Sequence, residues 1–187
     1  MENFTDVYTD YLISSVSYTT ATGLASLLSV KHDKITRCLS KGVYDSKFLW
    51  KTVKPYIQEV VQSKESVFLS FDDSIEAKPY SDESELICWH FDHSINRSVK
   101  GVNFLSALVQ TADMRLPCAV EFVCKNKWET DPKSGKQKRV ADKTKNELFR
   151  QMLLKCREQF RFDYVLADSW YASVENMKLI RFLISFE

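Results

Sequence analysis

Two short apolar stretches that each end in aspartate carry the clearest capacity for chemistry in this sequence. The first is Ser66 to Asp73, whose apolar residues lack a helical period and are typical of a strand buried on both faces. The second is Phe162 to Asp168, again a short apolar run that ends in an Asp. Central strands with such ends place carboxylates side by side, where they can share divalent cations.

An alternative stays open for the first pair of acids. Asp is common in turns, so Asp72 or Asp73 could cap the turn after the strand and help to end it. Carboxylates at the rim of a sheet are costly unless they are paired, protonated or metal-bound. The second stretch with the same ending favours a shared site.

Five motifs occur in order along the chain, and they carry a family resemblance. They are Asp72-Asp-Ser-Ile-Glu-Ala-Lys-Pro, Cys88-Trp-His-Phe-Asp-His-Ser, Val99-Lys-Gly-Val-Asn, Lys145-Asn-Glu-Leu-Phe-Arg-Gln-Met and Tyr164-Val-Leu-Ala-Asp-Ser-Trp-Tyr. Together they resemble the DDE transposases of bacterial insertion sequences over roughly Val67 to Met177.

The resemblance implies an α/β fold with an RNase H-like mixed sheet, in the order strand, strand, strand, helix, strand, helix. It implies that Asp72 and Asp168 are catalytic residues that bind Mg²⁺ or Mn²⁺, and the choice of Asp72 over its neighbour Asp73 as the metal ligand rests on this resemblance. Asp73 is expected in a supporting position, because its side chain should point to the opposite face of the strand from Asp72. The family's third acid, a Glu on a later helix, should follow downstream. Glu175 and Glu187 do not fit that position, so we expect the catalytic domain to be truncated at its C-terminus.

The implied reaction is two-metal phosphoryl transfer, in which DNA is cleaved at the element's ends and the freed 3′ hydroxyl attacks target DNA. One alternative is a catalytically inactive, truncated product that acts only as a DNA-binding protein. Another is an RNase H-type housekeeping nuclease, which the Trp89-His-Phe-Asp-His motif disfavours. The partner is double-stranded DNA in the first two cases, and a homodimer stays open.

The first 64 residues have a helical pattern, and we expect them to form a small all-helical domain before a catalytic domain of residues 65–187. Between Thr19 and Ser40 two apolar stripes flank a polar interruption of the length found in helix-turn-helix units, with Ser29 or Asp33 as an N-cap. The second helix would present Lys34 and Arg37 to DNA. The alternative is a plain helical hairpin with solvated lysines.

Charge is distributed unevenly, although the chain has a formal net charge of only +1. From Asp72 to Asp92 there are seven acids against one Lys, a net of −6, and from Lys125 to Arg161 there are twelve Lys and Arg against five acids, a net of +7. This division suits an enzyme that holds cations in one place and phosphates in another. Further phosphate contacts are expected from Lys78, Arg97 and Lys100.

The remaining patterns set bounds on the fold. Residues 74–97 are expected to form a polar loop, 99–111 and 116–124 a strand hairpin, 125–143 a basic loop, and Thr144 to Glu147 a capping box. His90, Asp92 and His93 have poor spacing for a zinc site. The five cysteines form no CxxC pair and predict reduced thiols, and no apolar run is long enough to span a membrane, so we expect a cytoplasmic protein.

Overall fold

The computed structural model describes residues 4–16, 18–62, 65–132 and 135–185, and the chain divides into two compact units, residues 1–44 and 45–187. The expected boundary lay after residue 64. The difference comes from helix α4 (Ser46–Gln62), whose Val53 and Ile57 are buried in the core of the larger unit. α4 is a single helix that includes Pro55.

Three helices form the small unit, namely α1 (Phe4–Ser14), α2 (Ala21–Leu27) and α3 (His32–Lys41). Their shared core contains Tyr11, Leu24, Ala25 and Ile35. Thr20 caps α2 by accepting a hydrogen bond from the Gly23 amide at 3.0 Å. The expected side-chain cap of α3 was wrong, because α3 starts after Lys31 without a capping side chain and Ser29 lies in the turn with a φ of 53°.

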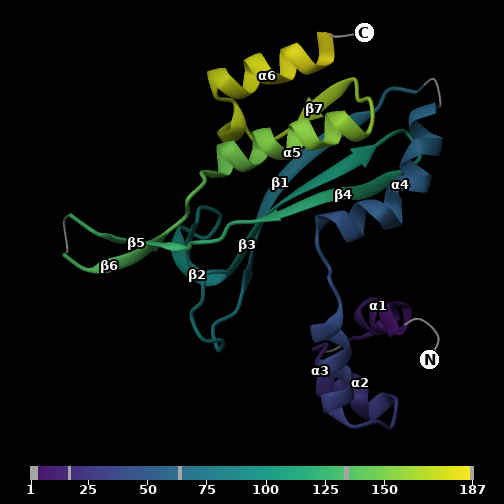
Figure 1. The fold of residues 1–187 in the computed structure, drawn as a ribbon, viewed down its shortest axis with the longest axis vertical. Helices are drawn as coiled ribbons and strands as arrows, with labels where there is room; N and C mark the ends of the chain where they lie inside the picture. Colours follow the sequence, from purple (N-terminus) through teal and green to yellow (C-terminus); the bar gives the residue numbers. More distant parts are fainter. Residues whose placement is uncertain (1–3, 17, 63–64, 133–134, 186–187) are drawn as a thin grey trace. The chain divides into compact units, whose positions relative to one another are not determined.

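The larger unit is built on a five-stranded mixed sheet, which confirms the predicted mixed α/β class (Figure 1). Its strands are β1 (Phe68–Ala77), β2 (Ile87–Asp92), β3 (Arg97–Gln110), β4 (Arg115–Phe122) and β7 (Tyr164–Leu166). β3 pairs antiparallel with β1 along one edge, and with β2 and then β4 along the other. β7 pairs with β1 in parallel.

The first strand continues further than expected. β1 extends through Ala77, so Asp72 and Asp73 lie in mid-strand opposite Ser106 and Leu105, and neither of them caps a turn. The sequence predicted that the two aspartates lie where β1 ends. They lie instead just beyond the end of its parallel neighbour, because β7 pairs with β1 only as far as Ser70. The two carboxylates therefore follow directly after the part of the sheet in which β7, β1, β3 and β4 lie side by side.

Two segments expected to be loops contain strands. Residues 87–92 form β2, in which Cys88 and His90 are buried while Trp89 and Phe91 are exposed. The buried His hides the usual apolar alternation, and this explains why the pattern was missed. The basic span contains a separate two-stranded sheet, β5 (Lys127–Thr130) with β6 (Gln137–Val140).

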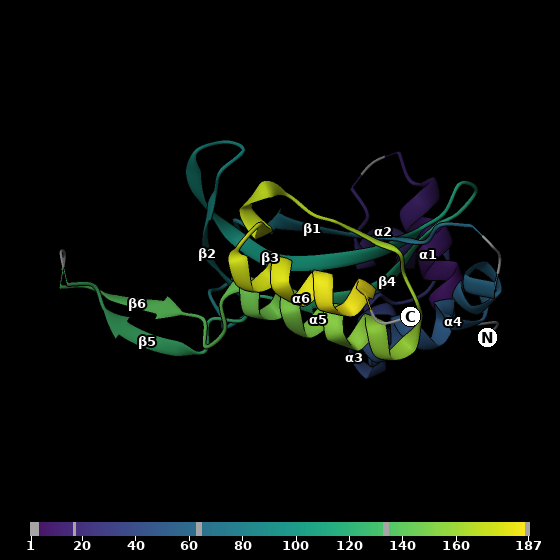
Figure 2. The same ribbon diagram turned by 90° about the horizontal axis from the view of Figure 1, so that it is seen from above.

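Helices α5 (Lys145–Gln159) and α6 (Val174–Ser185) lie next to each other on one side of the sheet (Figure 2). The predicted capping box of α5 is confirmed, with Thr144 and Glu147 bonding reciprocally. Beneath α5, the ring of Phe149 meets Phe71 edge-on at 4.6 Å between centroids and stacks on Tyr171 at 5.1 Å. This aromatic stack joins β1, α5 and the turn after β7.

The end of α6 differs from expectation. The truncation expected from the sequence would leave the apolar residues at the end of the chain, Phe182, Leu183, Ile184 and Phe186, with nothing to pack against. Leu183 is in fact buried in the core and Ile184 packs against it, whereas Phe182 is exposed and Phe186 lies outside the described residues.

The cysteines agree with the expectation of reduced thiols, since all five are free and Cys88, Cys118 and Cys156 are buried. Among the helices of the described residues, none has the length and apolar character needed to cross a membrane.

Candidate active site

A cleft of about 850 Å³ in the larger unit brings together the acids that the sequence singled out. Asp72, Asp73 and Asp168 all line it, although Asp168 is distant from the other two in the chain. The walls come from β1, β2, the end of β4, the start of α5 and the turn after β7. The cleft lies beside Asn103, where the outer edge of β3 changes its partner from β2 to β4.

Asp73 is held by two donors. The Lys145 ammonium forms an ion pair with its Oδ2, and the Tyr171 hydroxyl donates to its Oδ1 at 3.1 Å. Burial, followed by the negative charge of Asp73, raises the pKa of Tyr171 well above its ordinary value, so the hydroxyl keeps its proton and acts as a donor. Both carboxylate oxygens of Asp73 are thus engaged.

Asp72 and Asp168 are more accessible. Both are exposed, and within the described part of the chain no donor bonds the Asp72 carboxylate. Asp168 caps the short 3-10 helix Ser169–Tyr171, where its Oδ1 accepts from the Trp170 amide at 2.8 Å and from the Ser169 hydroxyl at 3.2 Å. The turn thereby fixes Asp168 by one oxygen.

Asn176 fastens that turn to both helices. It is fully buried, and its Nδ2 donates to the Tyr171 carbonyl at 2.8 Å and to Asn146 Oδ1 at 2.6 Å. Its Oδ1 accepts from Arg150 at 2.8 Å. Because every polar atom of this side chain has a partner, its burial is compatible with stability. Asn176 was not predicted from the sequence, where its only signal is a polar residue on the inner side of an apolar helix.

The lysines that line the cleft are not the phosphate contacts expected from the sequence, whose role stays a prediction. Lys125, Lys143 and Lys145 line it. Lys78, Arg97 and Lys100 do not, and Lys78 forms an ion pair with Glu76 at 3.1 Å. The missed signal was the position of Lys145, which is the first residue of α5, directly after the N-cap Thr144, and which pairs with Asp73.

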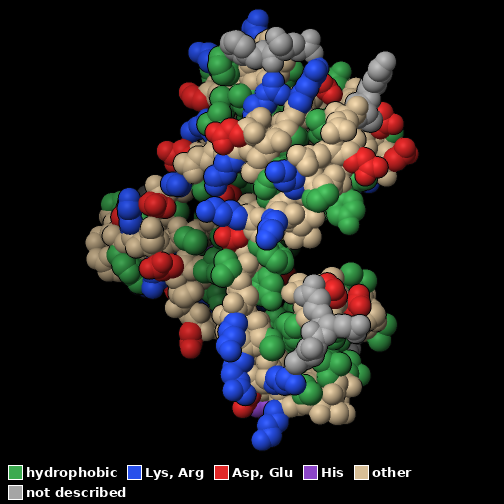
Figure 3. Space-filling view, turned by 45° about the vertical axis from the view of Figure 1, so that its right-hand side comes forward, with side chains coloured by type: hydrophobic (Ala, Val, Ile, Leu, Met, Phe, Trp, Pro, Cys, Tyr) green, Lys and Arg blue, Asp and Glu red, His purple; other side chains and the backbone are tan. Residues whose placement is uncertain are grey.

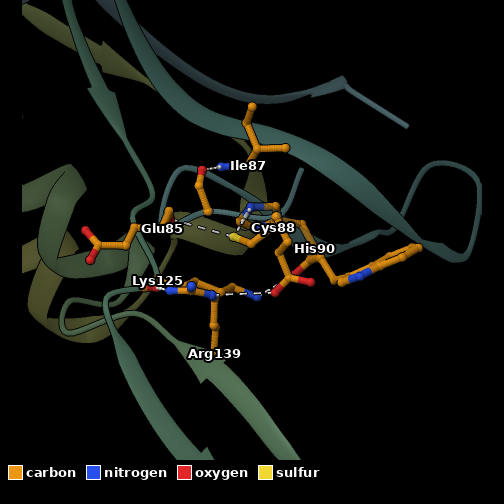
Figure 4. A network of polar contacts seen from close by, with 9 residues as sticks. Glu85, Ile87, Cys88, His90, Lys125 and Arg139 are labelled. Carbon is orange, nitrogen blue, oxygen red and sulfur yellow. Dashed lines mark hydrogen bonds and ion pairs between the residues drawn. The ribbon is translucent and has the colours of Figure 1, made fainter. Parts of the chain in front are cut away.

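On the β2 side, buried His90 faces the cleft and contacts buried Cys88, with 3.2 Å between Nε2 and Sγ (Figure 4). Burial raises the pKa of the Cys88 thiol, and burial together with Lys125 and Lys145 lowers the pKa of His90 to about 4. Both shifts favour a neutral thiol beside a neutral imidazole. The pair is therefore structural, and it lacks the thiolate that a cysteine nucleophile requires.

The chemistry of the cleft suits a divalent cation held loosely. Mg²⁺ is typically bound through one or two carboxylates plus substrate phosphates, and Asp72 and Asp168 offer unshared oxygens for this. Asn103 is buried in the cleft wall, and its Oδ1 has no hydrogen-bond partner among the described residues. The described residues contain no group of three or more His, Cys, Asp or Glu that could hold a metal ion.

The lowered pKa of His90 predicts a loss of stability in acid. The His90 imidazole takes up a proton near pH 6.5 in the unfolded chain and only near pH 4 in the folded chain. Its contribution to the free energy of unfolding is therefore complete above pH 6.5 and is lost as the pH falls towards 4. Relative to His90→Gln, the wild type should lose about 2 to 3 kcal/mol of unfolding free energy between pH 7.5 and 4.5. Urea unfolding at both pH values measures this. His93→Gln, at an exposed His, serves as the control, and equal pH dependence in all three proteins would contradict the prediction.

Comparison with known protein families gives a match that is consistent with the carboxylates in the cleft. The family described as DDE superfamily endonuclease matches residues 2–182. No match was found among the curated proteins or among the solved structures. A match over nearly the whole chain, with aspartates from β1 and from the turn after β7 lining one cleft, shows that the chain belongs to the DDE superfamily of endonucleases.

Proposed function

We propose that this chain is a DDE transposase of the bacterial insertion-sequence type, which cleaves DNA at the ends of its element and joins them to target DNA. One observation carries the proposal, namely that Asp72 and Asp168 line the same lysine-bearing cleft. The family membership supports nuclease chemistry on DNA. The order of β1, β3, β4, α5 and β7 further supports an RNase H-like core after a DNA-binding helical unit.

In this proposal the carboxylates and the lysines have separate tasks. Asp72 and Asp168 would hold Mg²⁺ or Mn²⁺, which when bound activates the attacking oxygen and stabilises the leaving one. Lys125 and Lys143 attract the phosphodiester by charge. Asp73 holds Lys145 at the start of α5, so that its ammonium lies beside the reacting group instead of extending into solvent.

The alternative is a catalytically inactive DNA-binding protein, which is favoured by the lack of a glutamate among the described residues that line the cleft. Glu175 is exposed at the start of α6 and does not line the cleft, while Glu187 lies outside the described residues. In either case we propose that the protein works in the cytoplasm on double-stranded DNA, and a homodimer is the simplest assembly that would bind two element ends.

The small unit would contribute DNA binding. Lys34 and Arg37 are exposed on α3, and Lys and Arg side chains gather along one edge of this unit in Figure 3. The Arg37 Nε donates to the Asp33 carbonyl at 3.2 Å, and this hydrogen bond leaves its two terminal nitrogens for other acceptors. Phosphate contact by these residues would position the larger unit on DNA.

A metal titration tests the assigned ligands. Mn²⁺ should bind weakly to the wild type, and Asp72→Asn or Asp168→Asn should lower the affinity by about tenfold or more, because a single carboxylate remains. Asp73→Asn should have a smaller effect. Asp92→Asn is the control, since Asp92 lines the cleft but accepts two hydrogen bonds from Ser94. Identical isotherms for all variants would refute the site.

Cleavage distinguishes the two functions. With supercoiled plasmid and Mn²⁺, we expect slow nicking that is lost in Asp168→Asn, because losing a ligand of a two-metal site costs orders of magnitude in rate. The rate itself should be low, since no glutamate among the described residues lines the cleft with Asp72 and Asp168. If the wild type and Asp168→Asn are equally inert while both bind DNA, the inactive DNA-binding protein is the better description.

Salt dependence tests the small unit. Lys34→Ala with Arg37→Ala should weaken duplex binding and reduce the log–log salt slope by about 0.9 for each lost phosphate contact. Fluorescence anisotropy between 50 and 200 mM salt measures both quantities. Thr36→Ala on the same helix is the uncharged control. An unchanged slope in the double variant would remove α3 from the DNA interface.

A further inference from the structure

The β5–β6 hairpin makes no evident contribution to the core. Its strands form a sheet of their own, and none of their described residues is buried. In both ribbon views the hairpin projects away from the five-stranded sheet and from α5 (Figures 1 and 2). An element that adds no core burial and exposes a Trp needs another explanation than stability.

Both ends of the hairpin lead into the candidate active site. Lys125, just before β5, lines the cleft, and so do Ala141, Lys143 and Lys145 after β6. The hairpin is thus an extension of the cleft wall. A polymer whose backbone passes through the cleft can continue along it.

The base of the hairpin is anchored by a polar network (Figure 4). Arg139 Nη1 donates to the Lys125 carbonyl at 3.4 Å, and Arg139 Nε lies 3.6 Å from Glu83 Oε1. Lys125 in turn bonds the segment around β2, with its amide donating to the Glu85 carbonyl at 2.8 Å and its Nζ to the Trp89 carbonyl at 2.5 Å. This network holds the base of the projecting arm at a fixed place beside β2.

The two faces of the hairpin carry different groups. Trp128 and Arg139 are cross-strand partners on one face, with the guanidinium carbon 4.5 Å from the ring centroid, and Trp128 is still 56% exposed. The other face carries the exposed residues Lys127 and Lys138, and Lys138 lies opposite Glu129 and 3.5 Å from Asp131 Oδ2. From Lys125 to Lys143 the sequence has seven Lys and Arg against three acids, a net of +4.

We propose that this hairpin is an arm that holds the duplex DNA flanking the phosphate bound in the cleft, with Lys127 and Lys138 on phosphates and Trp128 packed on sugar or base. The proposal rests on the proposed function, because it takes the cleft to be the place of cleavage. Net positive charge and an exposed aromatic suit a polyanion with π faces. The width of a two-stranded ribbon also fits the major groove of B-DNA.

Duplex binding by the full chain tests the arm. Lys127→Ala with Lys138→Ala should weaken binding and lower the log–log salt slope by about 1.8, since two phosphate contacts are lost. Trp128→Ala should weaken binding without changing the slope, because the ring carries no charge. The matched control is Lys51→Ala with Lys54→Ala, which removes two exposed lysines from α4 without touching the hairpin or the cleft. Circular dichroism verifies that each variant is folded.

The outcomes separate the arm from the cleavage chemistry. If the double variant of the hairpin lysines has the same affinity and salt slope as the double variant of the α4 lysines, the arm proposal is overturned, even where Asp168-dependent nicking is present. If the salt slope falls in the double variant of the hairpin lysines while neither the wild type nor any variant nicks DNA, the arm proposal stands and the proposed enzymatic function fails. A slope that falls equally for the α4 pair would show diffuse electrostatic binding and would also overturn the arm.

Discussion

The Asp73 carboxylate constrains this structure more than any other single group. Its side chain is only about a quarter exposed, and a carboxylate so far removed from water must be paired. The partners come from two places in the chain, the start of α5 and the turn after β7, through Lys145 and Tyr171. Beneath them, Phe149 stacks on Tyr171 and meets Phe71, so the ion pair sits on a packed aromatic stack. Moving β1, α5 or the turn after β7 would break both the polar contacts of Asp73 and the aromatic stack.

The central strand β3 supplies the second constraint, because it is paired along both edges. At Gly101 the neighbouring backbone is so close that a Cβ atom would lie 2.2 Å from the Glu76 carbonyl oxygen, and only glycine fits there. Two residues later, at Asn103, the outer edge passes from β2 to β4. The discontinuity in that edge opens the sheet where the carboxylates of β1 emerge, so the cleft follows from strand pairing.

The parts predictable from the sequence were those with local signals. The apolar runs before Asp72 and Asp168 indicated two neighbouring strands, and the Thr144 to Glu147 box marked the start of α5. β2 was missed because burial of His90 breaks the apolar alternation of that strand. Asn176 was missed because its value lies in partners from two other segments, which no local pattern reveals. The lysines of the cleft could not be told apart from the other lysines of the sequence, because only the fold shows that Lys145 lines the cleft and Lys78 does not.

Counting charge in the cleft links these features to DNA. Four aspartates, Asp72, Asp73, Asp92 and Asp168, and three lysines, Lys125, Lys143 and Lys145, line it, which leaves a net of −1 with His90 neutral. A phosphodiester is repelled weakly by such a surface, and one divalent cation at the carboxylates would reverse the sign to +1. The nearby lysines therefore act to bring the acidic site close to neutrality. In the proposed function, DNA affinity would then come mainly from surfaces outside the cleft, such as the basic residues on α3 and on the hairpin that extends the cleft wall.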